Sequence, residues 1–381
     1  MATTPNKKFR VLIVDDSTFM RKVLETILNS DDQLQVVGQA KDGREAVTLA
    51  ESLKPDVITM DINMPHVDGL QATAQIMTTN PRPIVIVSSE SREGAASTLK
   101  ALELGAIEFV AKPSSGIDLD MQSVKDDLLR KVRMSAKVRV VRTASRLAST
   151  LQAVSNSPAT LPQRVAPRPQ PTAPLDQRFP IVVLGASTGG PATVMRLAPG
   201  FTRDFPAAVF LVQHMPATFT TQYAAQLAEF TSIRVKEAEP NEPVQPGTLY
   251  ICPGAQHLRI TPTGRIQLDS TSGRINGYLP NIDVTMETAA AYAGAMTIGV
   301  VLTGMGNDGA AGAKAIRNAG GLVIAQDEAT SVIFGMPAEA IKAANVEQVL
   351  PLDDIYAAIE KRVINICKAT PAGAPTPVGG R

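Results

Sequence analysis

The sequence predicts two α/β domains, each built on a mostly parallel sheet with helices on both faces, joined by a long linker. Short apolar runs alternate with amphipathic helical patterns in two separate parts of the chain, which indicates parallel sheets. Between them, residues 155–178 contain six prolines and have the composition of an extended linker. A chain of 381 residues is long enough for two domains that each bury a core.

The first alternating pattern covers residues 9–113. Its expected strands are Arg10–Val14, Leu34–Gly38, Val57–Met60, Ile84–Val87 and Ile107–Val110. Helices are expected between the strands, for example over Ser17–Asn29 and Gly43–Ser52. A basic amphipathic helix is expected over Met121–Val141. Five βα repeats of this kind predict a parallel five-stranded sheet.

The second pattern begins at Ile181 and predicts another doubly wound, mostly parallel domain. Its expected strands are Ile181–Leu184, Ala208–Val212, Thr248–Ile251, Thr297–Leu302 and Leu322–Ala325. Its expected helices are Pro191–Leu197, Thr218–Phe230, Thr285–Ala293 and Gly309–Ala319. The stretch Arg234–Leu268 has short strands and Pro/Gly turns, which suggests an antiparallel flap or an edge of the sheet. We divide the chain into domains at 9–125 and 179–368, a basic helix and linker at 126–178, and a disordered tail at 369–381.

Composition narrows the class of protein. The only cysteines are Cys252 and Cys367, in unrelated contexts, so a disulfide framework is not expected and a reducing cytoplasm fits. No apolar run approaches the ~20 residues of a membrane span, and the first residues lack the apolar core of a signal peptide. We therefore expect a cytoplasmic protein without direct membrane insertion.

Charge is distributed unevenly along the chain. Residues 1–120 carry 12 Lys and Arg against 17 Asp and Glu, whereas residues 121–178 carry 11 against 3. Residues 179–381 carry 14 against 16. The basic middle segment fits a solvated helix and linker, or else a docking strip for an acidic partner. Nucleic acid is not an expected partner, because no recognition motif accompanies the charge.

Carboxylates gather at strand ends of the first domain. Asp15 and Asp16 end the first strand and Asp61 ends the third, and such ends converge at one edge of a parallel sheet. Clustered carboxylates repel one another unless a cation neutralises them, and Mg²⁺ prefers oxygen ligands. Ser88 and Lys112 follow the fourth and fifth strands and add a hydroxyl and a positive charge. This set of groups can hold a phosphoryl group on an aspartate.

Three segments of this domain resemble the response-regulator receiver family, which has a flavodoxin-like fold. They are Val14–Arg21 (VDDSTFMR), Met60–Gly69 (MDINMPHVDG) and Gly105–Pro113 (GAIEFVAKP). The resemblance implies that Asp61 is the phosphoacceptor. It also implies Mg²⁺ ligands at Asp15, Asp16, Asp61 and the Asn63 carbonyl, a switch pair at Ser88 and Phe109, and a phosphoryl contact at Lys112. His66 lies in the loop after Asp61, where we expect an exposed loop residue.

The second domain opens with the pattern that a serine nucleophile requires. A strand-forming run ends in Gly185-Ala-Ser187-Thr-Gly189, and a helix-permissive segment follows. This is G-x-S-x-G between a strand and a helix, the arrangement that holds a serine hydroxyl clear of the backbone. Neighbouring N–H groups at the helix start can face a developing oxyanion. The pattern therefore predicts acyl transfer through Ser187.

A serine nucleophile needs a base and an acid that orients the base. His214 follows the next strand along the chain, on the expected edge of Ser187, whereas His257 opens a strand after a Pro-Gly turn. Geometry therefore favours His214 over His257 as the base. Asp308 and Asp327 both follow strands and are the candidates for the orienting acid. The glycines around Asp308 let the backbone approach a site closely and favour Asp308, with Asp327 as the alternative.

The second domain resembles the chemotaxis protein-glutamate methylesterase family (CheB) at GASTGGP, QHMP, PGAQHL and LTGMGNDG, which begin at Gly185, Gln213, Pro253 and Leu302. The resemblance implies a triad of Ser187, His214 and Asp308, with Thr188 and Met305 lining the site and offering oxyanion N–H groups. It implies hydrolysis of glutamyl γ-methyl esters on methyl-accepting chemoreceptors and deamidation of receptor glutamines, without a cofactor for the hydrolase. It further implies phosphorylation by a CheA-type histidine kinase, activation by that phosphorylation, and recruitment to chemoreceptor arrays.

Other functions have weaker support in the sequence. A nucleotide-dependent oxidoreductase shares a glycine-rich turn, but none of the five tyrosines has a lysine four residues later, as short-chain dehydrogenases need. A non-catalytic binding module controlled by phosphorylation is the alternative that we keep. A DNA-binding regulator is disfavoured, because the second domain carries no helix-turn-helix signal.

Overall fold

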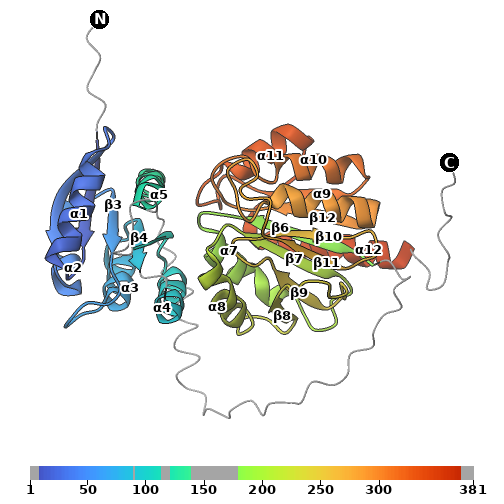
Figure 1. The fold of residues 1–381 in the computed structure, drawn as a ribbon, viewed down its shortest axis with the longest axis horizontal. Helices are drawn as coiled ribbons and strands as arrows, with labels where there is room; N and C mark the ends of the chain where they lie inside the picture. Colours follow the sequence, from blue (N-terminus) through green and yellow to red (C-terminus); the bar gives the residue numbers. More distant parts are fainter. Residues whose placement is uncertain (1–7, 89–90, 113–120, 139–178, 370–381) are drawn as a thin grey trace, which may run out of the picture. The chain divides into compact units, whose positions relative to one another are not determined.

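The structure is a computed structural model, and it describes residues 8–88, 91–112, 121–138 and 179–369. The chain divides into two compact units, residues 1–172 and 173–381. Each unit is an α/β domain and is described below by itself (Figure 1). The expected linker at 155–178 and most of the expected tail lie outside the described residues, although Ala369, placed in that tail, ends a helix.

The first unit contains a five-stranded sheet of order β2-β1-β3-β4-β5, in which all neighbouring strands are parallel. Its elements are β1 (Phe9–Val14), α1 (Thr18–Asn29), β2 (Leu34–Ala40), α2 (Gly43–Leu53), β3 (Val57–Met60), α3 (Gly69–Thr79), β4 (Ile84–Ser88), α4 (Arg92–Glu103), β5 (Glu108–Ala111) and α5 (Met121–Ser135). This confirms the predicted parallel sheet. The expected helix over 121–141 is helical to Ser135, and its last expected residues lie outside the described part.

The helices of this unit start where the sequence provides caps. Ser17, Asp42 and Asp68 precede α1, α2 and α3, and each side chain accepts a backbone N–H from the first turn of its helix. On one face of the sheet, Leu24 and Leu28 of α1 pack with Leu128 and Val132 of α5. Caps and apolar faces therefore set the helix positions, and the turns after β1 and β3 stay at the sheet edge.

The second unit contains a seven-stranded parallel sheet of order β14-β13-β12-β6-β7-β9-β8 and a separate antiparallel pair, β10 and β11. Its strands are β6 (Ile181–Ala186), β7 (Ala208–Gln213), β8 (Arg234–Glu237), β9 (Thr248–Ile251), β10 (His257–Ile260), β11 (Ile266–Asp269), β12 (Thr297–Val301), β13 (Leu322–Gln326) and β14 (Gln348–Leu350). Its α-helices are α7 (Gly190–Leu197), α8 (Ala217–Leu227), α9 (Ile282–Ala293), α10 (Ala310–Asn318), α11 (Met336–Ala344) and α12 (Leu352–Ala369). This confirms a mostly parallel, doubly wound domain.

Helices α9, α10 and α11 lie together on one side of β6, β7 and β12 (Figure 1). Their apolar residues form one buried cluster with the strands, in which Met286 of α9 and Ile316 of α10 meet Val183 and Phe210. The chain runs from β6 to β7 in one direction and returns to β12 on the other side of β6. In such sheets the crevice at the reversal is where ligands bind.

The stretch Arg234–Leu268 was expected to form an antiparallel flap or an edge of the sheet, and the structure contains both an antiparallel pair and the edge strand β8. β10 and β11 are antiparallel, but β8 pairs parallel with β9 at the edge of the main sheet. Between β8 and β9 the chain runs along β11, where Asn241 and Ile266 are hydrogen-bonded. This excursion brings the chain back in the same direction, so no tight hairpin forms. Helices α11 and α12 and strand β14 were not predicted from the sequence.

Candidate functional site

Ser187 stands on a tight turn between β6 and α7. Gly189 has φ +75°, a left-handed conformation that side chains rarely adopt, and α7 starts one residue later. A Cβ on Gly185 would come within 2.5 Å of Ile282, so the strand can approach α9 closely only with glycine there. The N–H of Ser187 donates to the carbonyl of Thr303 (3.0 Å), which fixes the turn to the end of β12.

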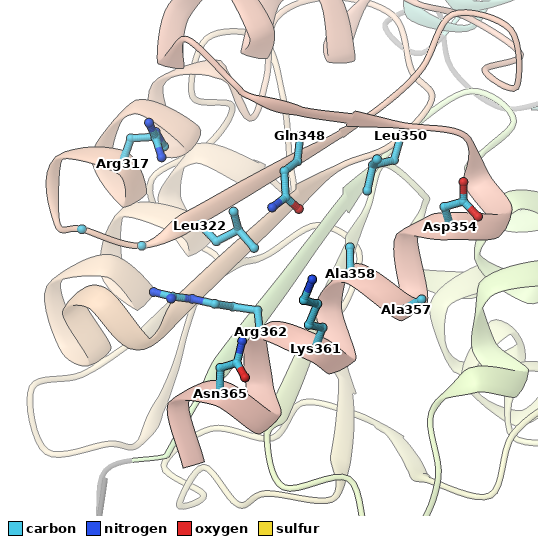
Figure 2. Close-up of a pocket in the computed structure, with 12 residues that line it drawn as sticks. Arg317, Leu322, Gln348, Leu350, Asp354, Ala357, Ala358, Lys361, Arg362 and Asn365 are labelled. Carbon is cyan, nitrogen blue, oxygen red and sulfur yellow. The ribbon is translucent and has the colours of Figure 1, made fainter. Parts of the chain in front are cut away.

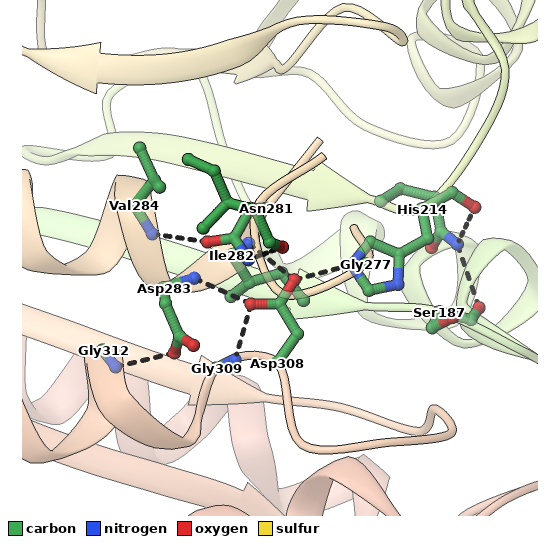
Figure 3. Close-up of polar contacts among 12 residues, drawn as sticks. Ser187, His214, Gly277, Asn281, Ile282, Asp283, Val284, Asp308, Gly309 and Gly312 are labelled. Atoms are coloured by element: carbon green, nitrogen blue, oxygen red, sulfur yellow. Dashed lines mark hydrogen bonds and ion pairs between the residues drawn. The ribbon is translucent and has the colours of Figure 1, made fainter. Parts of the chain in front are cut away.

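His214 directly follows β7, the neighbouring strand. Its backbone N–H donates to the Ala186 carbonyl (3.1 Å), which holds the residue beside the serine turn. Its ring atom Nε2 lies 2.7 Å from Oδ2 of Asp308. The other ring nitrogen, Nδ1, is therefore the one left to exchange a proton with a substrate or nucleophile. In Figure 3 the His214 ring lies between Asp308 and Ser187.

Asp308 is buried, with only 1% of its surface exposed, and its carboxylate accepts several backbone N–H groups. Its Oδ2 accepts the N–H of Ile282 (2.8 Å), and its Oδ1 accepts those of Asp283 and Gly309 (both 3.0 Å). Two of these donors are the first residues of α9, so the carboxylate lies at the positive end of a helix (Figure 3). Such bonds stabilise the charged form and orient it toward His214.

The side chain of Gln213 links the serine and histidine turns and was not anticipated from the sequence. Its Nε2 donates to the carbonyls of Ser187 (2.9 Å) and His214 (3.3 Å). Gln213 is buried at the end of β7, and Gly190 leaves room for its Oε1 atom. The signal in the sequence is a single polar residue that ends an apolar strand just before a candidate base. Tyr278, which stacks on the His214 ring, was also missed.

Thr188 and Met305 flank Ser187 from two different loops. Thr188 is buried, and its carbonyl accepts the hydroxyl of Thr303 (3.0 Å). A Cβ placed on Gly304 would lie 2.8 Å from the Cβ of Ser187, so the loop that carries Met305 touches the serine. Met305 is half-buried. The loop after β12 thus packs directly against Ser187.

The two alternative residues lie elsewhere. His257 is fully buried on β10, where its Nε2 lies 2.8 Å from the Gly273 carbonyl. Asp327 follows β13 and uses its Oδ1 to accept the N–H (2.9 Å) and hydroxyl (2.6 Å) of Thr330. His257 therefore contacts a distant loop and Asp327 organises a local turn, and Asp308 is the acid that contacts His214.

Asp283 is a second buried carboxyl close to Asp308. Its Oδ1 accepts the N–H of Gly312 (2.7 Å), which connects the starts of α9 and α10. Burial is the main cause that raises the pKa of Asp283 to about 6, and the neighbouring charge of Asp308 contributes to the same rise. Two carboxyl groups in different environments, those of Asp283 and Asp308, therefore lie close together at the start of α9.

The first unit brings three predicted carboxylates together. Asp15, Asp16 and Asp61 offer oxygens that all lie within 4.8 Å of one another. Nζ of Lys112 lies 2.9 Å from Oδ2 of Asp15 and 2.8 Å from Oδ2 of Asp61. Burial raises the pKa of Asp61 above its usual range, although Lys112 opposes the rise. Hard oxygen donors around a concentrated negative charge fit Mg²⁺.

The other residues predicted for this unit lie on β4, on β5 and in the loop after Asp61. Ser88 is buried at the end of β4, and its hydroxyl donates weakly to the Gly94 carbonyl (3.4 Å). Phe109 is buried on β5, with the Lys131 ammonium 4.9 Å from the centre of its ring. Asn63 and His66 are exposed in the loop after Asp61.

A pocket of about 660 Å³ lies away from the serine turn, between α12 and the strands β13 and β14 (Figure 2). Its lining includes Arg317, Lys361 and Arg362, together with Gly320 and Gly321 at the start of β13. Strand starts lie at the sheet edge opposite to the strand ends that carry Ser187 and His214. None of its lining residues is a serine, cysteine or histidine, so we assign no hydrolytic chemistry to it.

A protein of Pyrococcus horikoshii named protein-glutamate methylesterase/protein-glutamine glutaminase is 41% identical over 361 residues, which cover 94% of each chain. The chain belongs to the CheB methylesterase family. The model of the CheB methylesterase domain matches residues 182–359, and that of the response regulator receiver domain matches residues 11–123.

Other members of this family are similarly close. A Symbiobacterium thermophilum protein of the same name is 41% identical over 95% of this chain and 99% of its own. Among solved structures, the Thermotoga maritima CheB methylesterase catalytic domain is 40% identical, covering 48% of this chain and 98% of its own, with a TM-score of 0.46. Within the described residues, none of the helices has the length and apolar character needed to cross a lipid bilayer.

Proposed function

We propose that this chain removes methyl groups from glutamyl γ-methyl esters of methyl-accepting chemoreceptors and also converts receptor glutamines to glutamates. The ester or amide is cleaved at Ser187 with His214 and Asp308, and phosphorylation of Asp61 controls the rate. The names of the relatives support the two reactions. The receiver domain supports control by a phosphodonor, for which we propose a CheA-type histidine kinase.

The contact between His214 and Asp308 carries the hydrolase proposal. A buried carboxylate that accepts three backbone N–H groups has a fixed orientation, and Nε2 of the imidazole lies 2.7 Å from it. This contact sets the tautomer with the proton on Nε2 and leaves Nδ1 as the base. A half-buried serine on the adjacent strand end completes the arrangement of nucleophile, base and orienting acid.

In the first step, the Ser187 oxygen attacks the carbonyl carbon of the ester while its proton passes to Nδ1 of His214. The carbonyl oxygen becomes an oxyanion, which we assign to the backbone N–H groups of Thr188 and Met305. The imidazolium then returns its proton to the leaving oxygen, and the C–O bond breaks to release methanol. The γ-carbonyl of the glutamyl residue stays bound to Ser187 as an ester.

In the second step, a water molecule loses a proton to His214 and attacks that ester. Collapse of the second oxyanion returns the proton to Ser187 and releases the glutamate side chain. A receptor glutamine follows the same path with ammonia as the first product. Asp308 stays ionised throughout, because the backbone donors and the imidazolium both stabilise its negative charge.

For the receiver we propose Asp61 as the phosphoacceptor and Asp15, Asp16, Asp61 and the Asn63 carbonyl as the groups that hold Mg²⁺. The bound cation would neutralise the charge of the phosphoryl group and the carboxylates. Lys112 already bridges Asp15 and Asp61 and would contact the phosphoryl oxygens. Ser88 is buried at the end of β4 and Phe109 is buried within the neighbouring strand β5, and both are proposed to change position when Asp61 is phosphorylated.

The same proposal includes the domain limits and the location of the protein. We keep 9–125 for the receiver and 179–368 for the hydrolase, with 126–178 as the connecting segment. The matched ranges 11–123 and 182–359 lie inside these limits. A cytoplasmic location with recruitment to chemoreceptor arrays follows from the proposed substrate.

Release of methanol from membranes that contain methylated chemoreceptors tests this function. The wild-type protein should release methanol faster after a small phosphodonor is added. Ser187→Ala should lower turnover by roughly 10⁶, as loss of a triad serine does in a serine hydrolase. Ser232→Ala, an exposed serine outside the site, is the matched control. If wild type and Ser187→Ala release methanol equally slowly, the chain is a binding module and the hydrolase proposal is wrong.

A further inference from the structure

Tyr278 reaches the catalytic centre from a tight hairpin rather than from a strand end. Ile275 and Tyr278 exchange both backbone hydrogen bonds (3.0 Å each) around Asn276 and Gly277. These two central residues have φ of +52° and +88°. Positive φ at both positions of an Asn-Gly pair defines a two-residue turn of the mirror-image type, which is well suited to hairpins. The turn therefore has one preferred geometry, and it places Tyr278 at a defined point.

The hairpin is attached to the hydrolase domain before and after the turn. Before it, the buried His257 ring contacts the Gly273 carbonyl (2.8 Å); because a carbonyl only accepts, Nε2 of His257 is the donor. After it, Nδ2 of Asn281 donates to the Ile275 carbonyl (3.2 Å). Asn281 also caps α9 by accepting the Val284 N–H (2.9 Å). The helix end that binds Asp308 is thus the same one that anchors the hairpin.

The Tyr278 ring stacks on the imidazole of His214. The ring centroids are 4.7 Å apart and the planes are inclined by 16°. On its far end, the Tyr278 hydroxyl lies against Gly306, where an added Cβ would be only 1.9 Å from the oxygen. Tyr278 therefore fills the space between the histidine and the glycine-rich loop that precedes Asp308, and it covers one face of the imidazole.

We infer that Tyr278 is a positioning residue that fixes the plane of the His214 ring for proton transfer, an inference that rests on the proposed hydrolase function. The contact with Asp308 fixes only one ring atom, and rotation about the bond to the ring is broad for histidine. A stacked ring restricts that rotation and keeps Nδ1 directed to the serine side. Its electron-rich face also stabilises the imidazolium that forms when Ser187 loses its proton.

Removing the ring tests this role. Tyr278→Leu should lower kcat for methanol release about tenfold, because aromatic stacking and alignment of a base each affect the transition state by that order. KM should change less than about twofold, since the substrate contacts are not removed. Tyr278→Phe keeps the stacked ring and should restore most of kcat. A loss as large in Tyr278→Phe as in Tyr278→Leu would overturn the inference.

A spectroscopic measurement tests the same contact without turnover. Protons above an aromatic ring are shielded, so the ring protons of His214 should resonate upfield in the wild type. The chain has only three histidines, which makes the assignment simple. Tyr278→Leu should move the His214 resonances downfield, Tyr278→Phe should leave them, and His66 in the other unit is the reference. Unchanged His214 resonances and kcat in Tyr278→Leu would overturn the inference but not the proposed function.

A substitution at Gly306 tests the packing of Tyr278 against His214 in a second way. Gly306→Ala puts a methyl group where the Tyr278 hydroxyl lies, and it also strains a backbone with φ +95°. Adding Tyr278→Phe removes the clashing oxygen but not the backbone strain. The double variant should therefore have several-fold higher kcat than Gly306→Ala alone. Equal kcat of the single and the double variant would contradict the inferred packing of Tyr278 between His214 and Gly306. An inactive wild type would overturn the proposed function itself.

Discussion

The backbone N–H of Asp283 donates to Oδ1 of Asp308 at 3.0 Å, so two buried carboxyl groups meet at the first turn of α9. They differ in their partners. Asp308 accepts three backbone N–H groups and contacts His214, whereas the Asp283 carboxyl accepts the Gly312 N–H and has a pKa raised to about 6 by burial and by Asp308. The fold thus orients the Asp308 carboxylate toward His214, whereas burial favours the neutral form of Asp283.

Asp283→Asn should change how stability depends on pH. The folded-state pKa is above the ordinary 3.8, so the carboxyl stabilises the fold fully below pH 3.8 and loses this effect as pH rises through about 6. Asn keeps an oxygen for Gly312 and does not titrate. As the pH rises from 4 to 7, the free energy of unfolding of the variant should therefore increase relative to that of wild type by on the order of 1–2 kcal/mol, allowing for partial solvation of the carboxyl.

Tyrosine fluorescence during urea unfolding measures this difference in the full chain. All five tyrosines lie between positions 223 and 356, and tryptophan is absent, so the signal reports on the second domain. Asp204→Asn, at an exposed carboxyl, is the control and should differ from wild type by a constant amount. A constant difference for Asp283→Asn as well would show that burial does not perturb this group.

Asp308→Asn should lower turnover by roughly 10⁴, because an amide can donate to Nε2 and favour the wrong tautomer of His214. Asp327→Asn should have a mild effect, since the Asp327 carboxylate contacts Thr330 in a local turn. Single-turnover methanol release by both variants makes the comparison. The opposite order of effects would mean that Asp327 orients the base.

His257→Gln should retain far more activity than His214→Gln. Glutamine can place its Nε2 near that of histidine, so it can still donate to the Gly273 carbonyl. The same change at position 214 removes the base that takes the Ser187 proton. Initial rates at saturating substrate separate the two, and equal losses would point to His257 as a direct participant.

Much of the fold can be predicted from local sequence patterns, whereas contacts between segments distant in the sequence cannot. The apolar runs at Ile181 and Ala208 predict central strands, because residues buried on both faces must all be apolar. Asp308 and Asp327 both follow strands, and only the strand order β13-β12-β6 puts Asp308 next to the serine strand. Tyr278 comes from a hairpin whose position depends on α9 and β10. Such a contact between distant segments leaves no periodic signal.

Lys112→Met should make the stability of the first unit depend more strongly on Mg²⁺. The ammonium bridges Asp15 and Asp61, and without it the clustered carboxylates have lost a neutralising charge. Amide exchange of β1 and β3, measured with and without Mg²⁺, should show a larger protection by the metal in this variant than in wild type. Lys100→Met, which removes an exposed pair with Glu103, is the control. An equal metal effect in all three proteins would argue against Mg²⁺ at these carboxylates.

Removal of the receiver should release the hydrolase from control. An enzyme regulated by phosphorylation needs two states of different activity, and the modification must shift the population between them. If the unphosphorylated receiver holds the hydrolase in the less active state, a fragment that begins near Gln177 should demethylate receptors at least about fivefold faster than the unphosphorylated full chain. A small phosphodonor should activate the full chain but neither the fragment nor Asp61→Asn. Steady-state methanol release by the three proteins decides the point. A fragment no faster than the full chain would mean that the receiver acts differently, for example by bringing the enzyme to its receptors.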